Sequence, residues 1–394
     1  MATPESTVLR RRWFLAGAAL TITGVTAYSL LAEDDVYPPN RWFGVFTPGR
    51  DLALLDEVIK PLAKQPSAVG YFVKLNSEFT GAMLEKFALR GLTPFLTLEP
   101  WLWNSKPTQM LPELSLKSLN AGTYDEDLRR IAQVVATFNR PVMIRLAHEF
   151  NGHWYPWSVG QNGNTAADYI AFWRHVRDIF SIAPHVRWVW ATAAMHALRR
   201  GAPDIATCWP GDALVDFAGT TGYGWEKDAH TTYHRTLSKI ATFTNKDFII
   251  PEMGAQNGVN KAGTPAPQWT ASLIPYLRDN PRIRGFVWFH IGAPGEGATG
   301  DYRLRDQRVQ SALNRVLDEV PIASNTAMRT PTGTLRVGVS PNAAVNPTLA
   351  MYSRDVVKGH ACDPRKQRFG YDKNGTLYQC WTHPRGWSHW KPVE

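Results

Sequence analysis

Two glutamates in this chain each follow an apolar run that is typical of a buried strand. Glu149 comes after residues 141–146, and Glu252 comes after residues 248–251. In parallel sheets that are covered on both faces, ligands bind beyond the carboxyl ends of such strands. Two carboxylates held about 5 to 5.5 Å apart can cleave a glycosidic bond with retention of configuration, one as the nucleophile and the other as the acid. Glu252 and Glu149 are therefore a candidate catalytic pair.

Aromatic and basic side chains accompany both glutamates. Trp154 and Trp157 follow Glu149, and an apolar setting raises the pKa of a carboxyl group, as an acid catalyst requires. Arg145 and Tyr223 could supply donors that keep the other carboxylate ionised. An unpaired charge at Arg145 inside a barrel would be costly, so we expect it to pair with a carboxylate of the site. The residues that we expect to bind substrate are Arg145, His148, Trp154, Tyr223, Trp288, Glu99, Trp101, Trp157 and His290.

Each candidate also has an interpretation without function. A single glutamate at a strand end is more often a solvated or salt-bridged loop residue, whereas two at opposed strand ends with aromatic company favour catalysis. His148 could equally be a hydrogen-bonded packing residue. Trp288 lies inside an apolar run and could equally belong to the core.

No metal or cofactor is expected. His148 and His153 superficially suggest a zinc-binding helix, but they are five residues apart instead of four, and Gly152 and Pro156 oppose a helix. The glycines of residues 295–300 match a dinucleotide-binding fingerprint by letter only, because no further strand–helix–strand unit follows to bind the ribose.

Strand-like and helix-like segments alternate from about residue 40 to about residue 320. Eight strands are predicted, with helices between most of them. This count and size favour an α/β fold, a closed (β/α)₈ TIM barrel, over an open doubly wound sheet. The predicted strands are residues 41–47, 68–75, 93–98, 141–149, 186–191, 214–219, 248–252 and 283–289. The predicted helices are residues 51–62, 77–90, 124–138, 165–181, 231–243, 270–278 and 305–320, with a weak one around 203–209 and a long polar loop at 104–122.

The end of the fourth predicted strand poses a geometric problem. Successive residues of a strand point to opposite faces, so His148 and Glu149 cannot both point into the barrel from a regular strand. If both belong to the site, the chain near His148 must contain a bulge or a strained peptide, a feature common next to active sites.

Residues 1–36 precede the predicted barrel and carry a targeting pattern. Arg10, Arg11 and Arg12 come before a mildly apolar segment at residues 13–32. The pattern resembles a twin-arginine export signal, which places the protein in the periplasm or outside the cell. A retained membrane anchor is the alternative, since the segment is about long enough to span a bilayer.

The chain beyond residue 320 changes in composition. Residues 321–350 are rich in Thr, Pro, Ala and Asn and are predicted to form a linker. Residues 351–394 are predicted to form a small all-β module, with Cys362 and Cys380 bridged and Cys208 left free and buried. This tail is net basic; a solvated surface is the favoured interpretation, and contact with an acidic cell-envelope polymer is the alternative.

Overall composition is that of a globular protein, with 44% hydrophobic and 20% charged residues. Sixteen tryptophans are unusual; their rings match the C–H faces of sugars, with extra core packing as the alternative. The net charge of +9 partly reflects the three leader arginines, and no segment resembles a nucleic-acid-binding module. We expect a monomer.

The ordered motifs resemble glycoside hydrolase family 26. They are Arg145-x-x-His148-Glu149, then Asn151-Gly152-x-Trp154, and later Glu252-x-Gly254 after an apolar strand. The resemblance covers roughly residues 40–320. It departs at residues 220–222, where the family usually has an acidic residue before the tyrosine, and at Phe289-His290, where polar groups are frequent.

The resemblance implies a retaining (β/α)₈ enzyme acting on a β-linked polysaccharide, mostly β-mannan with some β-glucan and xylan. It implies Glu149 as acid/base, Glu252 as nucleophile and His148 as an orienting residue, and it places Arg145, Trp154, Tyr223 and Trp288 around the cleaved sugar. The alternative is a catalytically idle barrel that binds polysaccharide or assists assembly of the envelope or its exopolysaccharide.

Overall fold

A computed structural model describes residues 41–49, 52–102, 110–292 and 300–323. Beyond these it describes residues 358, 360 and 361 and four short strands between residues 352 and 392. The predicted export segment lies outside the described residues, and so do residues 324–350 of the predicted linker.

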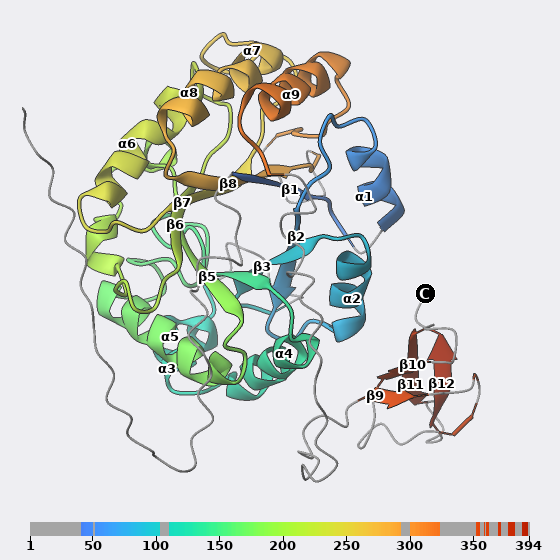
Figure 1. The fold of residues 1–394 in the computed structure, drawn as a ribbon. Coiled ribbons are helices and arrows are strands. Elements are labelled where there is room, and N and C mark those ends of the chain that lie inside the picture. Colours follow the sequence, from blue (N-terminus) through green and yellow to red (C-terminus); the bar gives the residue numbers. More distant parts are fainter. Residues whose placement is uncertain are drawn as a thin grey trace, which may run out of the picture. The chain divides into compact units, whose positions relative to one another are not determined.

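Eight parallel strands close into a barrel, which confirms the predicted TIM barrel (Figure 1). The strands neighbour one another in chain order, and β1 pairs with β8 in parallel register to complete the ring. Every catalytic candidate lies in or just beyond one of these strands. They are β1 (Trp42–Phe46), β2 (Ala68–Lys74), β3 (Thr93–Glu99), β4 (Val142–Leu146), β5 (Val186–Ala193), β6 (Phe217–Thr221), β7 (Phe248–Met253) and β8 (Ile283–Phe289).

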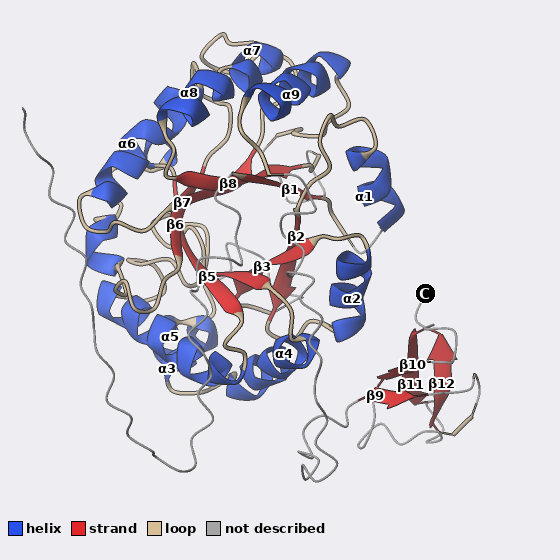
Figure 2. Ribbon diagram, viewed as in Figure 1, coloured by secondary structure: helices blue, strands red, loops and turns tan. Residues whose placement is uncertain are grey.

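Helices surround the barrel on its outside (Figure 2). They begin at conventional caps where the sequence supplies them; Thr165 and Asp168, for example, form a reciprocal capping box. The α-helices are α1 (Leu52–Ile59), α2 (Gly81–Leu89), α3 (Leu116–Asn120), α4 (Asp125–Phe138), α5 (Ala166–Ile179), α6 (Ala229–Ala241), α7 (Ala266–Ala271), α8 (Leu273–Asp279) and α9 (Gln307–Glu319). Short 3-10 turns are η2 (Pro112–Leu114), η3 (Phe180–Ile182), η4 (Met195–Ala197) and η5 (Ile205–Cys208).

Two helix predictions need correction. The single helix predicted at 270–278 is two helices that meet at Ser272, because Pro275 has no N–H to donate to the Ala271 carbonyl. The weak helix at 203–209 is only the 3-10 turn η5, and the polar loop at 104–122 contains η2 and α3.

Strand side chains alternate between two apolar layers. One layer packs between strands and helices, and the other fills the barrel interior with Trp42, Phe95, Met143, Val189 and Ile249 among its members. A Cβ at Gly285 would lie 2.0 Å from the Trp42 ring, so the absence of a side chain there lets the indole fill the interior. The interior is therefore packed below the polar end of the strands.

The tail contributes a four-stranded sheet in the order β12-β11-β10-β9. Its strands are β9 (Tyr352–Arg354), β10 (Phe369–Tyr371), β11 (Leu377–Thr382) and β12 (Ser388–Pro392). Cys362 lies outside the described residues, and so does the side chain of Cys380, so the bridge between them stays a prediction. Cys208 is free and buried, as predicted.

Within the described ranges, no helix is both long and apolar enough to cross a bilayer. The same residues contain no group of three or more His, Cys, Asp or Glu side chains placed to hold a metal ion.

Candidate active site

The chain that leads to Glu149 leaves regular strand geometry at the end of β4. Ala147 and Glu149 have φ angles of +43° and +53°, a region that costs a non-glycine residue about 1 to 3 kcal/mol. The segment nevertheless keeps its neighbours: Ala147 N–H donates to the Leu98 carbonyl at 3.0 Å and Glu149 N–H donates to the Ala191 carbonyl at 2.9 Å. The predicted strain near His148 is confirmed. The prediction that Glu149 ends the fourth strand is wrong, because β4 ends at Leu146 and Glu149 lies three residues beyond it.

Asn151 fixes the loop that follows Glu149. Its side-chain amide donates to the Ala193 carbonyl at 2.9 Å and accepts from the Ala193 N–H at 2.8 Å, which reproduces a strand pairing with β5. The side chain is 1% exposed, so these bonds are screened from water.

The Glu149 carboxyl group lies among apolar and weakly polar partners. The Trp154 indole N–H donates to its Oε2 at 2.9 Å, and the Thr221 hydroxyl also hydrogen-bonds to it. Burial, followed by the negative charge of Glu252, raises the pKa of Glu149 to about 7. A carboxyl group with this pKa carries a proton it can give up near neutral pH.

Glu252 lies at an irregularity of β7. Between Ile250 and Met253 this strand presents an extra residue against β8, as in a β-bulge. The Glu252 carboxylate forms a buried ion pair with Arg145 through its Oε1 and accepts the Tyr223 hydroxyl on Oε2 at 2.5 Å. Two donated bonds, one of them from a guanidinium, are what an ionised carboxylate accepts. The prediction that Arg145 pairs with a site carboxylate is confirmed.

A network of β-strand hydroxyls holds Arg145 in place. Its Nη2 and Nε donate to the Thr97 hydroxyl at 2.7 and 3.1 Å, and its Nη1 donates to Thr221 at 3.4 Å. The guanidinium also lies 5.6 Å from the centre of the Phe72 ring. Because Thr221 contacts both Arg145 and Glu149, it links the two carboxyl groups.

Comparison with known proteins agrees with this geometry. Residues 85–263, which include both glutamates, match the model of glycosyl hydrolase family 26. The chain contains a glycosyl hydrolase family 26 domain. The predicted resemblance is therefore confirmed.

Individual relatives of the family 26 domain are distant. The chain is 29% identical over 229 residues to Endoglucanase H of Acetivibrio thermocellus, covering 54% of this chain and 23% of that protein. It is 26% identical over 319 residues to Beta-1,3-xylanase TXYA of a Vibrio species, covering 72% of this chain and 66% of that one. The chain thus spans less than two thirds of each of these proteins.

Among solved structures, the GH26 domain of an endo-beta-mannanase/endo-beta-glucanase from Prevotella bryantii matches with a TM-score of 0.56 at 14% identity. The match covers 75% of this chain and 94% of that domain, and it shows the shared fold.

Three of the predicted aromatic contacts of the family 26 domain belong to its core instead. Trp157 is fully buried, donates its indole N–H to the His148 carbonyl and stacks 4.2 Å from the Tyr155 ring. Trp101 is also buried, 5.8 Å from Trp157. Both rings belong to the apolar core cluster in this structure.

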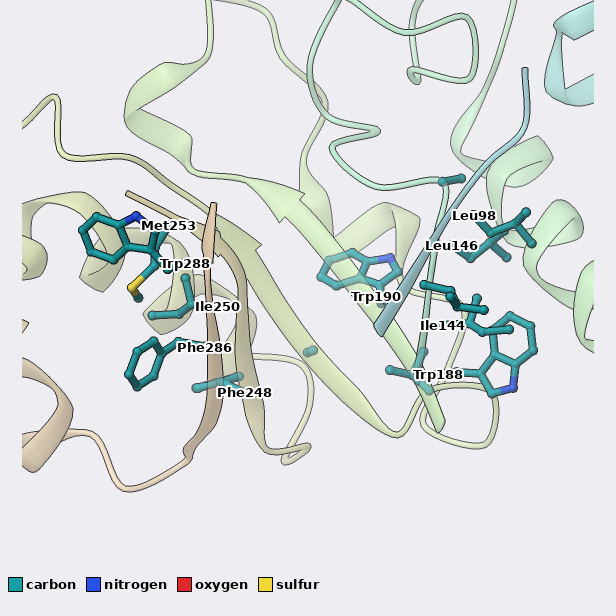
Figure 3. Close-up of a cluster of buried hydrophobic side chains, with 14 of the residues drawn as sticks. Leu98, Ile144, Leu146, Trp188, Trp190, Phe248, Ile250, Met253, Phe286 and Trp288 are labelled. Atoms are coloured by element: carbon teal, nitrogen blue, oxygen red, sulfur yellow. The ribbon is translucent and has the colours of Figure 1, made fainter. Parts of the chain in front are cut away.

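Trp288 is the third. The interior residues of β8 are its neighbours Val287 and Phe289, so the alternation of the strand turns Trp288 to the outer, helix-facing layer. Figure 3 shows it beside Met253 in this apolar cluster, and its indole N–H donates to the Tyr302 carbonyl at 3.0 Å. The core alternative was the correct one.

His290 also differs from its predicted role. It is buried, and its Nδ1 accepts the Leu304 backbone N–H at 3.0 Å. Its backbone N–H donates to the Phe46 carbonyl at 2.9 Å. His290 therefore ties the segment before α9 to the barrel.

Glu99 ends β3 beside the site but is only 3% exposed. Its Oε2 accepts the Trp101 indole N–H at 2.8 Å. Burial raises its pKa to about 7, against the opposing charge of Lys74, and the charges of Arg145 and Glu252 also act on it. Glu99 is thus a second protonatable carboxyl group close to the pair.

His148 presents a neutral ring. Burial, followed by the charge of Arg145, lowers its pKa well below the usual value. Its ring lies 5.0 Å from Tyr155 and 6.0 Å from Phe72, and its buried Nδ1 has no hydrogen-bond partner among the described residues. The predicted bond from His148 to the Glu252 side is taken up by Arg145 and Tyr223, so a bond to a substrate hydroxyl remains as the prediction.

Several functional residues were not identified from the sequence. Tyr155 is partly exposed over Trp157, and the charges of all three carboxyl groups raise its pKa beyond the effect of burial. Its place in the aromatic run after Glu149 was the available signal. The threonines whose hydroxyls hold Arg145 gave no signal in the sequence, because threonine is common in buried strands. The unpredicted residues are Phe72, Thr97, Tyr155 and Thr221; Asn151 belonged to the quoted motif, but its pairing with β5 was not predicted.

Proposed function

We propose that the protein is a retaining glycoside hydrolase that cleaves a β-linked polysaccharide of mannan, glucan or xylan type within the chain. The observation that carries this proposal is the pair of carboxyl groups in unlike surroundings. Glu252 is ion-paired to Arg145, whereas burial raises the pKa of Glu149 to about 7. Pairs of this kind divide the nucleophile and acid roles between two like side chains.

The proposed reaction has two displacements. Glu252 attacks the anomeric carbon while Glu149 protonates the departing glycosidic oxygen, and a glycosyl–enzyme ester forms. Glu149, now ionised, takes a proton from water as the water attacks the same carbon and releases Glu252. Trp154 donates to Glu149, so it stabilises the ionised form that acts in the second step.

Azide tests the two roles. With an aryl β-glycoside that has a good leaving group, Glu252→Ala should be inactive, and azide should restore turnover with an α-glycosyl azide as product. Glu149→Ala should keep activity on this substrate, and azide should there yield the β-glycosyl azide. The same anomer from both variants would contradict the assignment.

An idle, binding barrel is the competing function. Release of reducing ends from β-mannans, β-glucans, xylans and the host's own exopolysaccharide separates the two. Complete inactivity on this panel, together with preserved binding, would favour the idle barrel.

We propose in addition that residues 1–36 direct export to the periplasm or the cell exterior. The adjacent arginines 11 and 12 before an apolar segment support this proposal. Cell fractionation of the wild type and of the Arg11→Lys, Arg12→Lys double variant tests it, because the double variant should accumulate in the cytoplasm. Equal export of both would contradict it.

A further inference from the structure

A pocket lies between the loop that follows Glu149 and the loop that follows β5. Its volume is about 120 Å³. Since a water molecule takes up about 30 Å³ in the liquid, the pocket has room for a carboxylate and the ring carbon that bears it. It is lined by Asn151, Gly152, His153, Val159, Gly160, Gln161, Leu198, Arg199, Gly201, Ala202 and Pro203.

The charged side chains at this pocket are all basic. Arg199 lines it, Arg200 follows directly, and both side chains are exposed. Neither guanidinium forms an ion pair with a described residue, and no acidic residue lines the pocket. Asp204, the nearest acid along this loop, pairs with Lys239 at 3.3 Å. A guanidinium without a partner presents a planar fork of donors that matches a carboxylate.

The pocket is one residue layer away from the acid. A Cβ on Gly152 would lie 2.6 Å from the Trp154 ring, so the backbone of Gly152 lies against the indole that donates to Glu149. His153, on the pocket wall, meets the same indole at 5.2 Å in an edge-on contact. On the proposed function, Glu149 protonates the departing oxygen, so the loop that carries it faces the leaving-group sugars.

We propose that this pocket binds the carboxylate of an acidic sugar on the leaving-group side of the cleaved bond, with Arg199 as its main ligand. The substrate is then a β-linked polysaccharide that contains uronic acid residues. This inference rests on the proposed function, because the role of Glu149 as the acid decides on which side the leaving-group sugars lie. It deepens that function by naming the substrate class.

Binding to the inactive Glu252→Ala protein tests the proposal without turnover. The ligands are β-linked oligosaccharides in which glucose and glucuronic acid alternate, and the same oligosaccharides after chemical reduction of their carboxylates to alcohols. Titration calorimetry should give an affinity at least about tenfold higher for the acidic form, as expected for a charge-assisted bidentate bond.

Matched variants locate the effect. In the Glu252→Ala background, Arg199→Gln should remove the preference for the acidic form and leave binding of the reduced form within about twofold. Arg199→Lys keeps the charge but not the fork, so it should retain only part of the preference. Arg235→Gln, an exposed arginine on α6 that does not line the pocket, removes the same charge and should change nothing.

Three results would overturn the proposal. They are equal binding of the acidic and reduced forms, absence of binding by either, and a preference that survives Arg199→Gln. Equal affinity for a sulfated oligosaccharide of the same backbone would overturn the carboxylate assignment in favour of a general anion site. Failure of the proposed function is a separate result, since it would appear as inactivity of the wild-type protein on the acidic and reduced oligosaccharides as well as on the polysaccharide panel.

Discussion

The ends of β4 and β7 carry the same side chain in opposite surroundings. Both segments depart from regular strand geometry: Ala147 and Glu149 have positive φ after β4, and β7 presents an extra residue against β8. Yet Glu149 receives an indole N–H and a threonine hydroxyl, whereas Glu252 receives a guanidinium and a phenolic hydroxyl. The two glutamates therefore differ in protonation and in proposed role because of the side chains around them.

The source of those partners is instructive. Arg145 belongs to β4, the strand that leads to Glu149, but it pairs with Glu252 on the opposite side of the ring. Its direction follows from alternation along β4, which turns Arg145 into the barrel with Met143. The carboxyl end of β4 therefore leads to Glu149 and also carries the arginine that pairs with Glu252.

The largest expected effect comes from Arg145→Met, which removes the charge partner of Glu252. Breaking a buried pair from one side costs roughly 3 to 5 kcal/mol of folding free energy, so the midpoint of thermal unfolding should drop. Loss of the guanidinium beside the nucleophile should also lower kcat by roughly a hundred- to a thousandfold. Kinetics at a temperature where circular dichroism shows folded protein measure this effect. Arg278→Met, which removes an exposed ion pair with Glu319, is the control and should leave kcat unchanged. If both variants behaved alike, the contrast between the two strand ends would be lost.

His148→Ala tests the β4 side. We expect kcat to fall by roughly ten- to a thousandfold, the range of a lost positioning or electrostatic contact. Because the ring is buried among aromatic neighbours, His148→Phe serves as a control that keeps an aromatic ring but removes its nitrogen atoms. Restored turnover in His148→Phe, or parallel losses of stability and activity in His148→Ala, would mark the ring as packing.

The pH profile distinguishes the two ends directly. Glu149 acts as an acid only when protonated, and its pKa is raised to about 7. Activity should therefore persist below this pH and fall about tenfold per pH unit above it. A profile of kcat/KM from pH 4 to 9 measures the descending limb, and a limb that stays flat to pH 9 would contradict the assignment.

Trp154→Phe sharpens this test. The indole N–H stabilises ionised Glu149, so its loss should move the descending limb to higher pH, by up to about one unit. Trp101→Phe is the matched control, since that indole donates to Glu99 instead. A shift of the limb in Trp101→Phe alone would show that Glu99 is the group that titrates.

The smallest effect is expected from truncation after Val320. If the two strand ends complete the site by themselves, hydrolysis of short oligosaccharides should change by less than about twofold. Loss of all activity in a folded barrel would mean that the tail completes the cleft. The bridge between Cys362 and Cys380 stays a prediction, which mass spectrometry of the non-reduced protein can check.

The sequence predicted most of the framework. Apolar runs of strand length that alternate with amphipathic helical segments specified the eight strands, because this spacing buries both faces of a parallel barrel. The same runs placed Glu149 and Glu252 beyond the carboxyl ends of strands four and seven. The conflict between strand alternation and two adjacent site residues predicted the strain near His148.

Side-chain direction and partner choice were decided only in the folded structure. Trp288, Trp101, Trp157 and His290 were predicted to contact substrate, yet the first three pack in the core and the fourth holds a backbone N–H. A shift of one residue in a strand reverses every side chain, and composition does not reveal the register at a strand end.

By itself, then, the sequence determined the barrel and the two carboxyl groups, since local hydrophobic periodicity carries that information. The sequence suggested Arg145 and Tyr223 as donors to the second carboxylate, but only the tertiary structure shows that both side chains reach Glu252. The Arg145–Glu252 contact joins residues 107 positions apart, and the Thr97 and Thr221 hydroxyls that orient the arginine come from two other strands. Contacts between such distant residues arise from closure of the ring, which no local pattern encodes.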